Sequence, residues 1–250
     1  RKAFFRYQEY PLQKREAMIA HVRSRLLEKV DLLSELAVAE TGLGRVEDKV
    51  VKNRLVITKT PGPEILRPES QSGDDGLVLT EWAPYGTIGA ITPVTNPSET
   101  VINNGISMLA AGNTVVFNGH PSAKDVTRLA ISLINEAAEE MGAPKNLLTC
   151  CRVPTLETAQ TLMHHGQIRL LVVTGGPGVV RAALDSGKKC ITAGPGNPPV
   201  VVDETADVAK AARDITAGGS LDNGIICTCE KEILVVESVR EELLRELARC

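Results

Sequence analysis

Apolar residues near the N-terminus recur every three to four positions, the spacing that places side chains on one face of a helix. The residues with this spacing are Met18, Val22, Leu26, Val30, Leu33 and Leu36. They predict one long helix over residues 11–39, ended by the glycines at positions 42 and 44. A second helix with a polar face is predicted over residues 46–58. Residues 61–76, rich in Pro, Gly, Ser and Asp, are predicted to form a surface loop.

From residue 77 onward, short apolar runs alternate with helical patterns. Strands are predicted at residues 77–82, 87–92, 114–117, 147–153, 170–174, 200–202 and 233–236. Helices are predicted at residues 97–111, 122–141, 155–164, 178–185, 206–217 and 238–250. Strand–helix–strand repeats at this spacing indicate parallel pairing with right-handed crossovers. We therefore expect an α/β fold with a doubly wound, Rossmann-like parallel sheet, whose ligands bind beyond the carboxyl ends of the strands.

The composition narrows the function classes. The 250 residues are 43% hydrophobic and 24% charged, with a formal net charge of -3, which is typical of a globular protein and offers no basic surface for nucleic acid. No apolar run reaches the roughly 18 residues of a membrane span. The six cysteines lack the spacing of a zinc site or a disulfide scaffold. We expect a cytoplasmic protein with reduced thiols, no metal, no nucleic-acid partner and no membrane partner.

The loop after the strand at 87–92 contains Asn96 followed by Pro97. Asn before Pro is a good helix start, because the Asn side chain can accept a backbone N–H at the N-cap and Pro fits the first helical position. The alternative is that the Asn96 amide projects over the strand end and donates to a developing oxyanion. The residues alone leave both readings open and favour the cap.

Two other loops open helices with small residues, an arrangement that attracts phosphate groups. One runs from Asn118 through His120 to Lys124, where His120 is either a base or a partner in a loop hydrogen bond. The other, residues 174–178, has the sequence Thr-Gly-Gly-Pro-Gly and does not match the G-x-G-x-x-G fingerprint of dinucleotide sites. Residues 193–199 form a glycine- and proline-rich bend without an ionisable side chain.

Cys227 lies on a bend that begins at Gly224 and has few charges nearby in sequence. A nucleophilic thiol needs such close backbone approach and partial exclusion of water. The alternative is ordinary, because most cysteines are small buried hydrophobic residues.

Taken together, these loops resemble the aldehyde dehydrogenase superfamily, and within it the CoA-acylating branch that includes acetaldehyde and propionaldehyde dehydrogenases of bacterial microcompartments. The resemblance rests on residues 91–97, 102–113, 116–124, 173–178 and 222–227, in order and at family spacing. It implies that Cys227 attacks a short aliphatic aldehyde, that Asn96 and the Cys227 N–H bind the oxyanion, and that NAD and CoA are the cofactor and co-substrate. The implied cofactor-binding residues are Thr92, Pro93, Val94, Asn118, His120, Pro121, Thr174, Gly175, Gly176, Gly178, Ala193 and Gly194.

One position distinguishes the branches of the superfamily. Hydrolytic relatives carry a glutamate where this chain has Ala193, and without that base water is a poor acceptor for a thioester. The resemblance thus favours acyl transfer to CoA over release of a free acid, with a non-catalytic nucleotide-binding scaffold as the other alternative. Asn118 stands where many hydrolytic relatives have a ribose-contacting lysine, which leaves the choice between NAD and NADP open.

The resemblance also implies an organisation into segments. Residues 1–76 would pack on the cofactor domain, 77–84 would be part of an oligomerisation arm, 85–215 would bind NAD and CoA, and 216–250 would begin the catalytic domain. The family's catalytic domain continues well beyond its cysteine, so we expect most of it to lie outside these residues. Homo-dimers or tetramers, and association with a microcompartment shell or cargo, are the implied assemblies.

Overall fold

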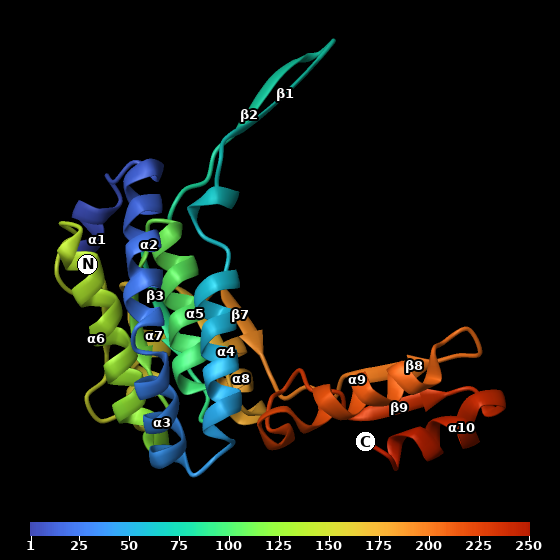
Figure 1. The fold of residues 1–250 in the computed structure, drawn as a ribbon. Helices are drawn as coiled ribbons and strands as arrows, with labels where there is room; N and C mark the ends of the chain where they lie inside the picture. The colour runs from blue at the N-terminus through green and yellow to red at the C-terminus, as the bar shows by residue number, and fades with distance from the viewer.

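A five-stranded parallel sheet forms the centre of the fold in the computed structural model, which describes residues 1–250 (Figure 1). Its strands are β3 (Thr87–Ile91), β4 (Thr114–Asn118), β5 (Leu148–Cys150), β6 (Ile168–Thr174) and β7 (Cys190–Ala193), in the spatial order β5-β4-β3-β6-β7. The chain builds outward from β3 through β4 to β5, then returns to the other side of β3 with β6. The strand order therefore reverses between β3 and β6, the position where doubly wound sheets bind ligands.

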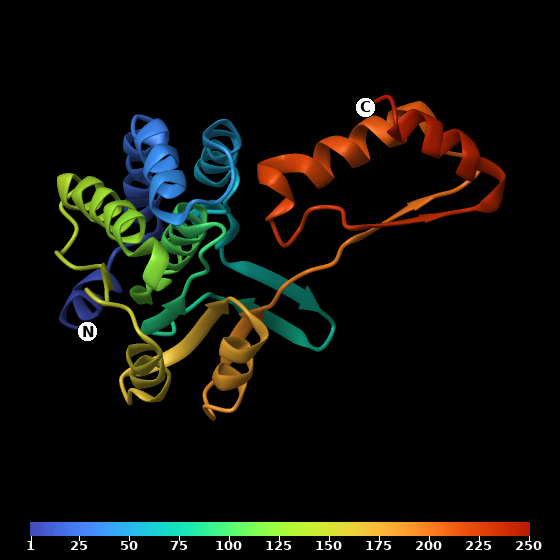
Figure 2. The ribbon, with the colours of Figure 1, turned by 90° about the horizontal axis from the view of Figure 1, so that it is seen from below.

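Helices cover both faces of the sheet, which confirms the predicted doubly wound α/β class (Figure 2). One face carries α2 (Leu12–Leu27), α3 (Val30–Thr41), α4 (Val46–Lys59), α5 (Pro97–Ala110) and α6 (Lys124–Glu140), and the other carries α7 (Leu156–His164) and α8 (Pro177–Leu184). The larger core lies under the first group and includes the fully buried side chains of Leu33, Ile102 and Phe117. A smaller core of eight buried residues lies under α7 and α8. Strands buried on both faces explain the nearly continuous apolar runs in the sequence.

The N-terminal region differs from the prediction in two places. Residues 11–39 form two helices rather than one, because the chain leaves the helical path at Glu28 and Lys29 between α2 and α3. Both helices bury their apolar faces in the same core, so the apolar spacing continues across the break and conceals it. A short helix, α1 (Lys2–Tyr7), was not predicted; its Tyr7 hydroxyl donates to the Leu109 carbonyl at 2.8 Å.

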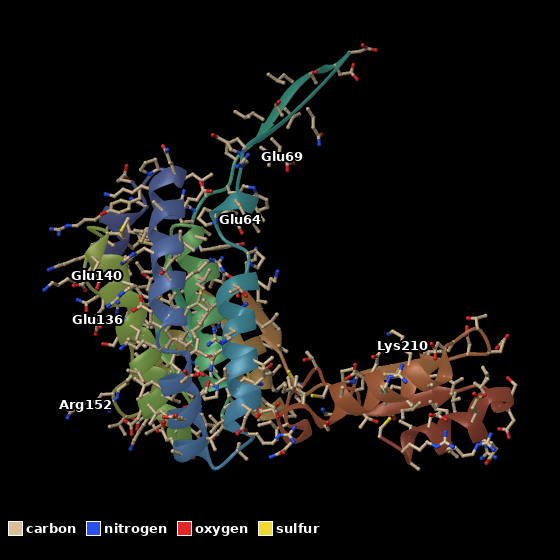
Figure 3. The ribbon with its side chains drawn as sticks, in the orientation of Figure 1. Glu64, Glu69, Glu136, Glu140, Arg152 and Lys210 are labelled. Atoms are coloured by element: carbon tan, nitrogen blue, oxygen red, sulfur yellow. The ribbon has the colours of Figure 1, made fainter.

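The predicted loop at residues 61–76 contains a strand instead. β1 (Glu69–Gly73) pairs antiparallel with β2 (Gly76–Thr80), and every residue of both strands is exposed. β1 is polar and has no buried face, so its sequence lacks the alternation that identifies a strand. The hairpin stands away from the rest of the molecule, and its Glu69 side chain lies in the open (Figure 3).

The C-terminal part forms a unit of its own beside the sheet (Figure 1). β8 (Pro199–Val202) pairs in parallel with β9 (Glu232–Val235), and α9 (Val208–Ser220) and α10 (Glu237–Leu247) pack with them. The expectation that residues 200–202 extend the main sheet is therefore wrong. The partner strand comes much later in the chain, which a local pattern cannot reveal. Residues 200–202, assigned with the cofactor domain from the sequence, pack here with α9 and α10. No helix in the structure has the length and apolar character needed to cross a membrane.

Candidate active site

A cavity of about 510 Å³ opens at the carboxyl ends of β3, β4, β6 and β7, where the strand order reverses. Most of the sequence-predicted site residues line it: Thr92, Pro93, Val94, Asn96, Asn118, His120, Pro121, Thr174, Gly175, Gly176, Gly194 and Cys227. Gly178 and Ala193 do not line it, since Gly178 lies within α8 and Ala193 pairs with Thr174 in the sheet. The fold thus brings residues that are far apart in sequence, such as Thr92 and Cys227, to one cavity.

The loop that carries Cys227 begins with an unusual backbone. Asp222, Asn223 and Gly224 all adopt left-handed conformations, with φ of 52°, 58° and 66°. Such a run costs conformational energy for the two residues with side chains, so contacts elsewhere must hold it in place. Lys231 supports the loop by donating from Nζ to the Ile226 carbonyl at 2.8 Å. The result is a sharp bend that presents the half-buried Cys227 to the cavity.

The backbone of the glycine-rich bend approaches Cys227 closely. A Cβ added at Gly196 would lie 2.1 Å from the Cys227 carbonyl oxygen, so only glycine fits there without movement. Cys229, two residues further on, is buried and does not line the cavity; its thiol faces the Leu221 carbonyl at 3.7 Å. Of these two neighbouring thiols, only Cys227 can meet a molecule in the cavity.

Asn96 occupies the N-cap position of α5, but its side chain makes no capping hydrogen bond. Its Oδ1 instead accepts a hydrogen bond from Lys52 Nζ at 2.6 Å, and its Nδ2 has only a 3.3 Å contact with Thr95 Oγ1. The cap favoured from the sequence is therefore absent. The amide N–H groups remain able to donate to a molecule in the cavity, as the oxyanion reading requires.

Four charged side chains behind the cavity form a buried cluster that sequence reasoning missed. Asp222 Oδ2 lies 3.0 Å from Lys49 Nζ and 2.5 Å from Lys52 Nζ, and Lys52 Nζ also lies 3.0 Å from Glu99 Oε1. All four side chains are less than 10% exposed. Both lysines come from the helix that was predicted to have a polar face.

The cluster shifts the pKa values of Asp222 and Lys52. Burial alone would raise the pKa of Asp222, but hydrogen bonds from Lys52, the Arg45 N–H and Lys49 hold that pKa below its usual value. Burial alone would lower the pKa of Lys52, but Glu99 and Asp222 raise it above its usual value. Lys52 and Asp222 are therefore an ion pair at neutral pH. This pair joins α4 to the loop that carries the cysteine.

Substitution of Gly44 tests how closely the cysteine loop packs against the turn after α3. Its φ is +80°, and a Cβ there would lie 2.0 Å from Asp222 Oδ1. Gly42 is a matched control, because its φ is +68° but a Cβ would meet nothing within 4 Å. We expect Gly42→Ala to cost about 1–2 kcal/mol of unfolding free energy for the left-handed backbone. Gly44→Ala should cost about 1–3 kcal/mol more, from the added overlap. Equal losses of unfolding free energy in the two variants, measured by urea unfolding, would contradict this close packing.

The loops after β4 and β6 fit a phosphate-containing cofactor. Gly176 is the N-cap of α8 and no side chain caps that end, so the first N–H groups of the helix are available to an anion. A Cβ on Gly175 would lie 2.6 Å from Val179 Cγ1, so a side chain at position 175 would displace that valine. His120 Nδ1 accepts the Ser122 N–H at 3.1 Å, which supports the loop-bond reading of His120.

Several cavity residues were not predicted. They come mainly from the two helices below the cavity and from the residues on either side of the cysteine: Thr155, Leu156, Ala159, Val179, Ile225 and Lys231. The apolar members of this set look like ordinary core residues in sequence, because the same helical spacing serves both purposes. No group of three or more His, Cys, Asp or Glu side chains is placed to hold a metal ion.

A cysteine and a free amide face one cavity at the reversal point of a Rossmann-like sheet, where doubly wound α/β proteins bind their ligands. The model of the aldehyde dehydrogenase family matches residues 1–249. The chain belongs to the aldehyde dehydrogenase family.

Two curated relatives belong to the CoA-acylating branch of this family. The chain is 48% identical over 246 residues to the propanal dehydrogenase (CoA-propanoylating) of Salmonella typhimurium, covering 98% of this chain and 53% of that protein. It is 53% identical over 232 residues to the acetaldehyde dehydrogenase (acetylating) of Escherichia coli K12, covering 92% of this chain and 50% of that protein. The chain thus spans about half the length of the curated relatives it matches.

Solved structures agree with this placement. A propionaldehyde dehydrogenase from the fucose utilisation microcompartment of Clostridium phytofermentans aligns with a TM-score of 0.95 at 47% identity, over 99% of this chain and 57% of that one. A Rhodopseudomonas palustris propionaldehyde dehydrogenase, solved with bound CoA and an acylated cysteine, aligns with a TM-score of 0.94 at 46% identity, over 99% of this chain and 57% of that one. These matches confirm the fold predicted from the sequence and the membership of the family.

Proposed function

We propose that the complete protein oxidises a short aliphatic aldehyde, propanal or acetaldehyde, to its acyl-CoA with NAD as the oxidant. The observation that carries the proposal is that Cys227 and the uncapped amide of Asn96 line one cavity. The similarity to propanoylating and acetylating relatives supports CoA as the acyl acceptor.

The chemistry follows from the two side chains. The Cys227 thiolate adds to the aldehyde carbon, and the carbonyl oxygen gains the negative charge. The Asn96 amide and the Cys227 backbone N–H would stabilise this oxyanion. A bound nicotinamide supplies the hydride acceptor. When the hydride leaves the carbon, the C–O bond regains its double-bond character and Cys227 holds an acyl thioester. The CoA thiolate then adds to the thioester carbon, and Cys227 leaves as a thiolate.

The choice of acceptor depends on whether a base can activate water. No Asp or Glu lines the cavity, and the bend at Ala193 and Gly194 offers only backbone and small side chains. Without a carboxylate beside the thioester, water attacks slowly, because general base catalysis contributes about 10²–10⁴-fold to such steps. A thiol that is a better nucleophile than water is then the favoured acceptor.

NAD would occupy the part of the cavity lined by the loops after β3, β4 and β6. Gly175 and Gly176, at the start of α8, would receive the phosphates, and Thr92, Pro93 and Val94 would border the nicotinamide side near Asn96. Asn118 Oδ1 already accepts a hydrogen bond from Thr158 Oγ1 at 2.6 Å, which limits its freedom to bind a ribose. This arrangement supports NAD binding by shape and backbone groups more than by charge.

A homo-oligomer is part of the proposal. The hairpin of β1 and β2 exposes Leu77, Val78 and Leu79 by 71%, 61% and 61% of their surface, and Trp82 nearby by 65%. An apolar hairpin of this kind is rarely left open to water, and burial against another subunit would cover it. The similarity to a relative from a bacterial microcompartment supports the same location for this protein, either associated with the shell or enclosed as cargo.

A product assay tests the proposed reaction. The complete protein is incubated with propanal and NAD, with and without CoA, and propanoyl-CoA is separated from propanoate. We expect propanoyl-CoA with CoA, and at least about 10²-fold slower propanoate formation without it, because no base activates water. Propanoate formed equally fast without CoA would show a hydrolytic enzyme with a base elsewhere. No reduction of NAD with either aldehyde would favour a non-catalytic scaffold.

A further inference from the structure

Lys52 lies behind the cavity and does not line it, yet its ammonium touches both sides of the site. Nζ donates to Asn96 Oδ1 at 2.6 Å and to Asp222 Oδ2 at 2.5 Å, and lies 3.0 Å from Glu99 Oε1. Two of the three N–H donors of the ammonium bond to Asn96 Oδ1 and Asp222 Oδ2, whereas Glu99 Oε1 is an ion-pair contact without a hydrogen bond. The side chain is only 9% exposed, so water does not compete for these bonds.

We propose that Lys52 is a positioning residue that orients and polarises the Asn96 amide as the oxyanion donor, an inference that rests on the proposed function. A side-chain amide has an acceptor end and a donor end of nearly the same shape. An ammonium can bond only to the oxygen. Lys52 therefore fixes Oδ1 away from the cavity and leaves the Nδ2 hydrogens to face it.

The charge on Lys52 adds a second effect. A hydrogen bond from a cation to the amide oxygen draws electron density from the amide, which makes its N–H groups stronger donors. The effect is largest where water is excluded, as it is around this buried ammonium. Without Lys52, the amide could rotate and present Oδ1, whose negative end would repel the oxyanion.

Lys52 also links this donor to the nucleophile. Asp222, which shares the ammonium with Asn96, lies five residues before Cys227 on the left-handed bend of the loop. One side chain of α4 therefore holds the start of α5 and the cysteine loop at a fixed separation. That separation sets how closely a carbonyl carbon at Cys227 can approach the donor with its oxygen.

Lys49 provides a matched control one turn earlier on α4. Its Nζ binds Asp222 Oδ2 at 3.0 Å and the Thr95 carbonyl at 3.1 Å, but does not contact the Asn96 side chain. Both lysines are buried and both hold Asp222. Lys49→Met removes an anchor of the cysteine loop, whereas Lys52→Met removes that anchor and also the partner of Asn96.

The test is a double-mutant cycle on kcat/KM for propanal in the complete protein. Asn96→Ala should lower kcat/KM about 10²–10³-fold, the usual cost of one oxyanion donor. Lys52→Met should lower it at least about 10-fold, but in the Asn96→Ala background its loss should shrink to within about 3-fold of the loss caused by Lys49→Met, because only the anchor of the cysteine loop then remains to be lost. The loss caused by Lys49→Met should instead multiply with that of Asn96→Ala.

Alkylation of Cys227 by iodoacetamide separates positioning from a general loosening of the site. Alkylation forms no oxyanion at Asn96, so Lys52→Met should keep the alkylation rate within about 3-fold of that of Lys49→Met while its turnover falls further. Lys52→Arg, which keeps a charged donor, should recover part of kcat/KM. Alkylation that falls in parallel with turnover, multiplicative losses in the cycle, or variants that do not fold would overturn the inference and leave Lys52 a structural residue. A wild-type protein that turns over no aldehyde would overturn the proposed function and this inference together.

Discussion

Cys227→Ala is expected to abolish acyl-CoA formation. Cys227 is the only cysteine that lines the cavity, and loss of a nucleophile in a covalent mechanism typically lowers kcat by about 10⁴–10⁶-fold. The substitution removes one sulfur atom from a half-buried side chain, so the free energy of unfolding should change by only about 1 kcal/mol. The measurement is acyl-CoA production with propanal, NAD and CoA, alongside urea unfolding of the same preparation.

Cys229→Ala is the control for this prediction. Cys229 lies two residues from Cys227 but is buried outside the cavity, so its removal should preserve most of the turnover. Labelling by iodoacetamide at the position of the nucleophile should persist in Cys229→Ala and disappear in Cys227→Ala. If Cys229→Ala lost activity as completely as Cys227→Ala, the assignment of the nucleophile would be wrong.

Asp222→Ala is expected to destabilise the protein strongly. Asp222 is the shared partner of two buried ammonium groups, and removal of one side of a buried ion pair typically costs about 3–5 kcal/mol. Asp214→Ala is the control, because Asp214 pairs with Lys210 on the surface of α9 and both side chains are more than 60% exposed (Figure 3). That change should cost less than about 1 kcal/mol. Urea unfolding of both variants at neutral pH compares the two losses.

The effect of Asp222 should depend on pH. Its carboxyl pKa is lower in the folded protein than in the unfolded chain, so folding favours the charged form. The stabilisation is complete above the unfolded pKa of about 3.9 and is lost as the pH falls through the folded value. The gap between wild type and Asp222→Ala should therefore be constant between about pH 5 and pH 7 and narrow below about pH 4. A loss below about 1 kcal/mol at pH 7 would show that the cluster is not an ion-pair anchor.

Much of the fold was predictable because the local sequence pattern determines many of its helices and strands. Strands β3, β4 and β6 are buried on both faces and appear as apolar runs, and their connecting helices have clear periodicity. The parts that were missed depend on distant partners. The short edge strand β7 alternates between half-buried and exposed residues, and only its pairing with β6 identifies it as a strand. The placement of β8 depends on β9, which follows after a whole helix and the cysteine loop.

The candidate site divides in the same way. Cys227 and Asn96 were identified from motifs, and the structure brings them to one cavity. The state of the Asn96 side chain could not be predicted, because the local sequence favours a cap and the competing partner, Lys52, is 44 residues away. The buried lysines of α4 look like a solvated face until Asp222 reaches them. Only the assembled tertiary structure distinguishes a helix surface from an anchor.

The connection between α4 and the cysteine loop also orders events during protein synthesis. Lys52 precedes Asp222 by 170 residues, so its ammonium leaves the ribosome long before its carboxylate partner exists. Until then, burial of Lys52 against the growing sheet is opposed by the cost of dehydrating a charge that has only Glu99 to compensate it. We therefore expect the packing around Lys52 to tighten when the cysteine loop is made. The nucleophile and the carboxylate that anchors α4 therefore arrive together, on one loop.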